Sequence, residues 1–98
     1  MTLSEKQLGV LLTINRENAD KSLVDLDQII ERQSYETNKP SIQFIIRNLV
    51  QKGLIEKTGS EVRNGRRKVL FKTTTLGEMY SKWNAKAKGE SLKELIVE

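Results

Sequence analysis

The side chains best suited to bind a partner lie along residues 39–52, where polar and apolar residues alternate with the period of a helix. Gln43, Phe44, Arg47 and Gln51 fall on one face of this segment. The opposite face is apolar and consists of Ile42, Ile45, Ile46, Leu49 and Val50. Arginine and glutamine present N–H donors in a geometry that suits the edges of guanine and adenine. We therefore expect the apolar face to build the core and the polar face to bind a partner.

A second basic group surrounds the dipeptide Asn64-Gly65, which is typical of a tight β-hairpin turn. The group consists of Arg63, Arg66, Arg67 and Lys68. Residues 39–72 hold nine basic and two acidic side chains, a net charge of +7, whereas residues 1–38 have a net charge of −3. Such a concentration favours a polyanionic partner, because each neutralised phosphate releases counterions. The alternative is a solvated hairpin edge whose charges only oppose aggregation.

Residue types exclude several kinds of chemistry. The chain has no cysteine and no histidine, so disulfides and the usual zinc ligand sets cannot form, and the commonest general base near neutral pH is missing. Acidic residues between positions 17 and 31 invite a metal-site interpretation, but they lack the spacing of a calcium loop and fit a solvated helix face better. They are Glu17, Asp20, Asp25, Asp27 and Glu31. We expect no enzyme activity, no cofactor and no metal.

The length of 98 residues suits one small domain. No apolar run approaches the roughly 20 residues of a membrane span, and the start of the chain lacks the pattern of a signal peptide. We expect an intracellular, cytoplasmic protein.

Local signals predict two helices in the first third of the chain. The first begins at Ser4, which can form a capping box with Gln7, and should end near Asn15. The second begins at Ser22 or at Asp25 and carries apolar residues at helical spacing. A polar connection is expected between them, and a turn follows the second helix.

The third helix is the one that carries the polar face. Thr37 or Asn38 can cap its start, and Gly53 suits the left-handed position that ends a helix. Two strands rich in branched residues are predicted over residues 54–58 and 68–73, with the basic turn region over residues 59–66 between them.

A further helix is predicted from Thr75 towards Gly89. Large apolar side chains recur in it at helical spacing: Leu76, Met79, Tyr80 and Trp83. They can pack on the core, or they can supply a dimer interface together with a second amphipathic piece after Gly89. We favour a homodimer.

Three helices, a two-stranded hairpin and a further helix, in this order, resemble a winged helix-turn-helix protein. The run Leu-Val-Gln-Lys-Gly-Leu-Ile-Glu-Lys over residues 49–57, the basic hairpin and then Thr-Leu-Gly-Glu over residues 75–78 are similar to the pattern of MarR-type and PadR-type transcriptional regulators. The resemblance implies a mainly α fold with a small β-hairpin (α+β). We place a winged-helix DNA-binding domain, C-terminal helix included, at residues 1–88 and a short amphipathic tail at residues 89–98.

The resemblance also implies sequence-specific binding of double-stranded DNA by a small transcriptional regulator. The third helix would enter the major groove with Lys39, Ser41, Gln43, Phe44 and Arg47. The basic hairpin, which would be the wing, would contact phosphates or the minor groove with Arg63, Arg66, Arg67 and Lys68. A homodimer would then bind a palindromic site whose half-sites lie ~34 Å apart.

Three alternatives stay open. Arg47 can pair with a carboxylate of its own fold instead of a base. Phe44 can touch a thymine methyl, pack under the wing or dock on a protein partner. The rival function is a winged-helix module for protein–protein interaction without direct DNA reading, in which Phe44 is the anchor and the basic wing meets an acidic protein surface.

Overall fold

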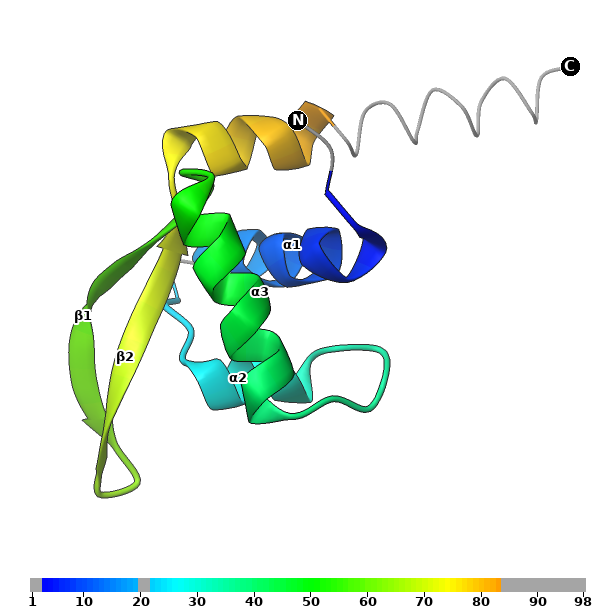
Figure 1. Cartoon of the computed structure of the whole chain (residues 1–98). Helices are drawn as coiled ribbons and strands as arrows, with labels where there is room; N and C mark the ends of the chain where they lie inside the picture. Colours follow the sequence, from blue (N-terminus) through cyan, green and yellow to red (C-terminus); the bar gives the residue numbers. More distant parts are fainter. Residues whose placement is uncertain (1–2, 20–21, 84–98) are drawn as a thin grey trace, which may run out of the picture.

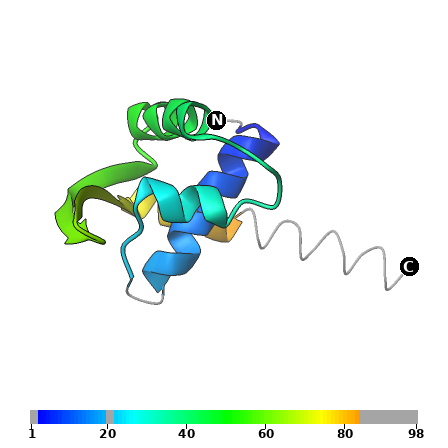
Figure 2. The same cartoon turned by 90° about the horizontal axis from the view of Figure 1, so that it is seen from below.

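The computed structural model describes residues 3–19 and 22–83 of the chain (Figure 1). Three helices precede a two-stranded antiparallel sheet, and residues 75–83 form a further helix. The labelled elements are α1 (Glu5–Ala19), α2 (Leu26–Glu31), α3 (Lys39–Gln51), β1 (Ile55–Arg63) and β2 (Arg66–Thr73). The hairpin, which we call the wing, projects from the helical body in both views (Figures 1 and 2). This arrangement confirms the predicted α+β fold class.

The helix α3 begins and ends at the predicted signals. Asn38 caps it, because its Oδ1 accepts a hydrogen bond from the backbone N–H of Ser41 at 3.0 Å. Gly53 follows the helix with a φ of 74°, which glycine adopts without strain. The predicted core face is buried at Ile42, Ile45, Ile46 and Leu49. Val50 differs from the expectation, since it is 37% exposed and faces the groove beside the wing.

The helix α1 starts as predicted but ends later. Ser4 and Gln7 form the capping box, with reciprocal hydrogen bonds of 3.0 and 3.2 Å between side chain and backbone. The prediction that the helix ends near Asn15 is wrong, because it continues to Ala19. Its last turn places Asn18 beside β2, where the side-chain oxygen accepts a hydrogen bond from a backbone N–H at 2.8 Å.

The segment before α2 pairs with the wing, which the sequence did not predict. Val24 forms an antiparallel bridge with Phe71, whose N–H donates to the Val24 carbonyl at 2.9 Å. Of the two possible starts of α2, Ser22 and Asp25, the structure uses the second. Asp25 Oδ1 accepts a hydrogen bond from the Gln28 N–H at 2.9 Å, and Gln28 Oε1 accepts one from the Asp25 N–H at 3.0 Å, which completes a capping box.

The wing strands are longer than predicted. The loop expected over residues 59–66 is reduced to the turn Asn64-Gly65, whose φ values of 53° and 77° match a type I′ turn. The register between the strands shifts near Gly59, which has a φ of 110° and lies in a β-bulge. The wing is therefore a continuous ribbon up to its tip.

The core joins α1, α2, α3 and the base of the wing, and the helix over residues 75–83 packs against it through Tyr80. The buried cluster consists of Val10, Leu11, Ile14, Val24, Ile29, Ile42, Ile45, Ile46, Leu49, Leu54, Ile55 and Phe71. Gly77 lets the last helix approach the chain at Leu54, because a Cβ on this glycine would lie 2.0 Å from the Leu54 carbonyl oxygen. The predicted extension of this helix to Gly89 and the tail at residues 89–98 lie outside the described residues.

Gly77→Ala should lower the free energy of unfolding by about 1–3 kcal/mol, because the new methyl group meets backbone that cannot move aside. For a domain of this size, each kcal/mol corresponds to roughly 4–8 °C in melting temperature, which calorimetry resolves. Gly9→Ala is the matched control, since its Cβ would lie 3.4 Å from Gln33 Oε1 and alanine favours the helix. Equal melting temperatures for the two variants would contradict the close approach.

Candidate nucleic-acid interface

The outer face of α3 carries exposed side chains at the predicted positions. Lys39, Ser41, Gln43, Phe44 and Arg47 are all exposed. The ion pairs within residues 3–19 and 22–83 do not include Arg47, so its pairing with a carboxylate of the fold is not observed there. Arg47 is thus an exposed cation beside the wing.

A groove of about 460 Å³ runs between α3 and the wing. Its charged lining consists of Lys39, Arg47, Lys57, Arg67 and Lys68 together with the carboxylates of Asp25 and Asp27. Five cations face two anions, so the groove favours a negatively charged ligand. Lys57 was not among the predicted site residues, although it belongs to the basic segment and its strand was predicted.

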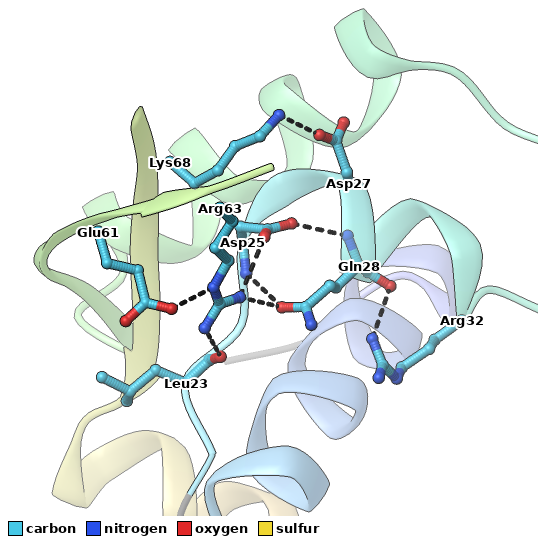
Figure 3. Close-up of polar contacts among 8 residues, drawn as sticks. All are labelled: Leu23, Asp25, Asp27, Gln28, Arg32, Glu61, Arg63 and Lys68. Carbon is cyan, nitrogen blue, oxygen red and sulfur yellow. Dashed lines mark hydrogen bonds and ion pairs between the residues drawn. The ribbon is translucent and has the colours of Figure 1, made fainter. Parts of the chain in front are cut away.

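At the tip of the wing, Arg63 turns back onto the body of the protein (Figure 3). Its Nη1 lies 3.0 Å from Asp25 Oδ2 and also donates to the Gln28 side chain, and its Nη2 donates to the Leu23 carbonyl at 3.1 Å. Its Nε pairs with Glu61. The carboxylates of Glu61 and Asp25 raise the pKa of Arg63 above its ordinary value. The sequence predicted a DNA contact for Arg63, whereas the structure gives its guanidinium partners within the fold.

Lys68 is held in the same way by Asp27 (Figure 3). This hydrogen-bonded ion pair lowers the pKa of Asp27, and the charges of Lys68, Lys39 and Arg66 act in the same direction. The Asp27 carboxylate therefore lies among cations that the sequence assigned to DNA. The sequence predicts a solvated helix face for Asp25 and Asp27, and this is wrong, because both carboxylates form ion pairs with the wing and Asp25 is buried.

Contacts at three levels thus join residues 23–27 to the wing: the Val24 bridge at its base, the Asp27 ion pair in its middle, and the Asp25 ion pair with the Leu23 hydrogen bond at its tip. We call residues 23–27 the wing brace. The Asp25-x-x-Gln28 capping box was visible in the sequence, but nothing local showed that its carboxylate would also hold an arginine 38 positions away.

Arg66 and Arg67 differ from the two braced cations. Both are exposed, and no ion pair ties either to a carboxylate of the described residues. Arg67 faces the groove towards α3, and Arg66 lines a second hollow between the wing and α2. The basic hairpin therefore divides into two braced and two unpaired cations.

Phe44 lies on the other flank of α3, away from the wing. Its side chain is 63% exposed and borders a shallow hollow of about 470 Å³ that α3 shares with the start of α1. The remaining lining residues are Ser4, Lys6, Gln7, Pro40, Ser41, Ile45 and Asn48. Because no residue of the wing lines this hollow, the alternative in which Phe44 packs under the wing is wrong.

The helix over residues 75–83 leaves much of its apolar face uncovered. Leu76, Met79 and Trp83 are 48%, 62% and 66% exposed. Tyr80 is half-buried, packs against the core and lies with its ring centroid 6.4 Å from that of Trp83. The four residues predicted for a dimer interface thus include three exposed side chains and one that also belongs to the fold.

Within the described residues, no group of three histidine, cysteine, aspartate or glutamate side chains could hold a metal ion. No helix in the same part of the chain is long and apolar enough to cross a membrane.

Three helices with α3 packed beside a braced β-wing define this protein as a winged helix-turn-helix structure, and solved structures with the same fold agree. FabT of Streptococcus pneumoniae in complex with DNA has a TM-score of 0.76 and 18% identity, over 96% of this chain and 60% of FabT. MepR, a transcription regulator of the Staphylococcus aureus multidrug efflux pump MepA, has a TM-score of 0.76 and 21% identity, over 97% and 64%. A mutant of MarR from E. coli has a TM-score of 0.74 and 21% identity, over 94% and 62%.

This chain therefore spans about three fifths of the length of these three proteins. No protein-family model matches the sequence, and no curated protein matches it significantly. The predicted resemblance to MarR-type regulators is confirmed at the level of the fold.

Arg63→Ala should loosen the wing, because it leaves the buried carboxylate of Asp25, whose side chain is 6% exposed, without its cation. The expected loss in the free energy of unfolding is about 1–3 kcal/mol, and the amide hydrogens of the wing should exchange faster. Arg67→Ala removes an equal charge from an exposed side chain and should change the free energy of unfolding by less than about 0.5 kcal/mol. If the two variants exchange alike, the brace does not hold the wing.

Proposed function

We propose that this protein binds double-stranded DNA sequence-specifically and acts as a small transcriptional regulator. The observation that carries the proposal is the groove between α3 and the wing, in which five cations face two carboxylates. The helix α3 and the wing lie on the two sides of this cationic groove. This placement suits a DNA duplex that takes α3 into its major groove and whose phosphate backbone contacts the wing. FabT, which shares the fold, has been solved in complex with DNA.

The proposed contacts divide by position along α3. Gln43 and Arg47 lie on the flank that faces the wing and carry the donors for base edges. Lys39 and Ser41 belong to the first turn, where the helix dipole also favours a phosphate. These residues give α3 both a phosphate-binding end and a base-reading face.

In the wing, Arg66 and Arg67 are proposed to meet phosphates or the adjacent minor groove. Arg63 and Lys68 are proposed mainly to position the wing, because their charged ends are already paired with Asp25 and Asp27. Of the four basic residues that the sequence predicted to contact DNA, two are thus proposed to contact it and two to hold the wing in place.

A homodimer is part of the proposal. The exposed side chains of Leu76, Met79 and Trp83 would pack against a second copy, together with Tyr80. Two-fold symmetry would then place two copies of α3 on a palindromic site, with half-sites ~34 Å apart.

The double variant Arg66→Ala with Arg67→Ala should bind a random-sequence duplex more weakly and with a shallower dependence on salt. Each lost phosphate contact should reduce the slope of log K against log salt by about 0.9, because fewer counterions are released. Fluorescence anisotropy between about 50 and 200 mM salt measures both quantities.

The matched control is Arg16→Ala with Lys82→Ala, which removes the same charge from exposed sites on α1 and the last helix. It should leave the slope unchanged. Negligible binding by the unaltered protein even at low salt would overturn the DNA proposal in favour of the protein-interaction module.

Met79→Glu with Trp83→Lys should convert the dimer to a monomer, because both side chains are exposed and the change is neutral in net charge. Sedimentation equilibrium would show the halved mass, and the melting temperature would show that the fold survives. Val62→Glu, at a wing residue that is 67% exposed, is the control and should remain dimeric. A monomeric unaltered protein would contradict the interface.

A further inference from the structure

Phe44 is a large apolar side chain that the fold does not use. It is 63% exposed, and it belongs to α3, whose buried face is already complete with Ile42, Ile45, Ile46 and Leu49. A phenyl ring that stays in water contributes no burial to folding, whereas contact with a ligand would remove its apolar surface from water. The inference drawn from it rests on the proposed binding of DNA by α3.

The position of Phe44 on α3 places it on the proposed reading face. At 100° per residue, Gln43, Arg47 and Phe44 follow one another around the helix, with Arg47 between the other two. Gln43 and Arg47 line the cationic groove on the wing side, and Phe44 begins the opposite flank. When Arg47 faces a base pair, the ring of Phe44 therefore faces the same major groove beside it.

The major groove offers a phenyl ring one apolar feature. Guanine, adenine and cytosine present hydrogen-bond donors and acceptors there, and thymine adds a methyl group at C5. A ring placed against the polar edges would leave their donors and acceptors without partners, which is unfavourable. A ring placed against the C5 methyl removes apolar surface of both groups from water.

We propose that Phe44 reads thymine through its C5 methyl group, next to the base pair read by Arg47. A protein partner fits this flank less well, because the hollow beside the ring is shallow and Phe44 is the one large exposed apolar side chain among the residues that line it. Stable protein interfaces need about 800 Å² per partner with an apolar centre, and one ring does not provide that centre. Uracil differs from thymine only in lacking this methyl group. The protein should therefore bind a duplex with uracil at this position more weakly than one with thymine.

The test compares thymine with uracil at single positions. Duplexes bound by the unaltered protein are selected from a random-sequence pool, and each thymine of a selected duplex is then replaced by uracil, which keeps the base pairing. For at least one thymine, the replacement should weaken binding by the unaltered protein about fourfold, the effect of one buried methyl group. The same replacement should leave binding by Phe44→Ala unchanged, which a double-mutant cycle expresses as coupling.

Val62→Ala is the matched control. Val62 is as exposed as Phe44 but lies in the wing, so its removal should preserve the fourfold preference for thymine. If the unaltered protein binds DNA but tolerates uracil at every position, or if Phe44→Ala keeps the preference, the assignment of Phe44 is overturned while the DNA proposal stands. If the protein selects no duplex at all, both are overturned.

Discussion

The buried carboxylate of Asp25 is the group on which the arrangement of the wing depends. One of its oxygens caps α2 through the N–H of Gln28, and the other accepts the guanidinium of Arg63 from the tip of the wing. A carboxylate in such a place needs hydrogen-bonding partners, because a buried and unpaired charge is strongly unfavourable. The same carboxylate thus ties the start of the short helix α2 to the tip of the long hairpin.

The wing brace also divides the basic residues of the wing into cations that are paired within the fold and cations that are not. Asp25 and Asp27 engage Arg63 and Lys68, and the carboxylate of Asp27 lies close enough to Lys39 and Arg66 for their charges to lower its pKa. The net charge of +7 over residues 39–72 is therefore not spread evenly over the surface, because carboxylates from an earlier segment of the chain lie among these cations. Arg47, Arg66 and Arg67 are exposed on α3 and the wing, and none of them forms an ion pair with a described residue.

What the sequence predicted well was local. The two faces of α3, its cap at Asn38 and the turn at Asn64-Gly65 depend on residues that are neighbours along the chain, and all three are present in the structure. What it missed depends on distant pairs. The last turn of α1 is held through Asn18 by an N–H 55 positions away, and Arg63 meets Asp25 across 38 positions. Helical period and charge were enough to predict which residues could form the site. They did not predict which of these residues pair with carboxylates of the fold.

The contacts between the wing brace and the wing have a consequence for the conformational entropy of the hairpin. A hairpin that moved freely would lose conformational freedom on meeting a ligand, and each side chain that becomes ordered costs about 0.5–1.5 kcal/mol of affinity. Here the backbone bridge at Val24 and the ion pairs of Asp25 and Asp27 impose that order during folding. The wing is thereby preorganised. The free energy of any contacts that it makes with a ligand would be offset less by the entropic cost of ordering the hairpin.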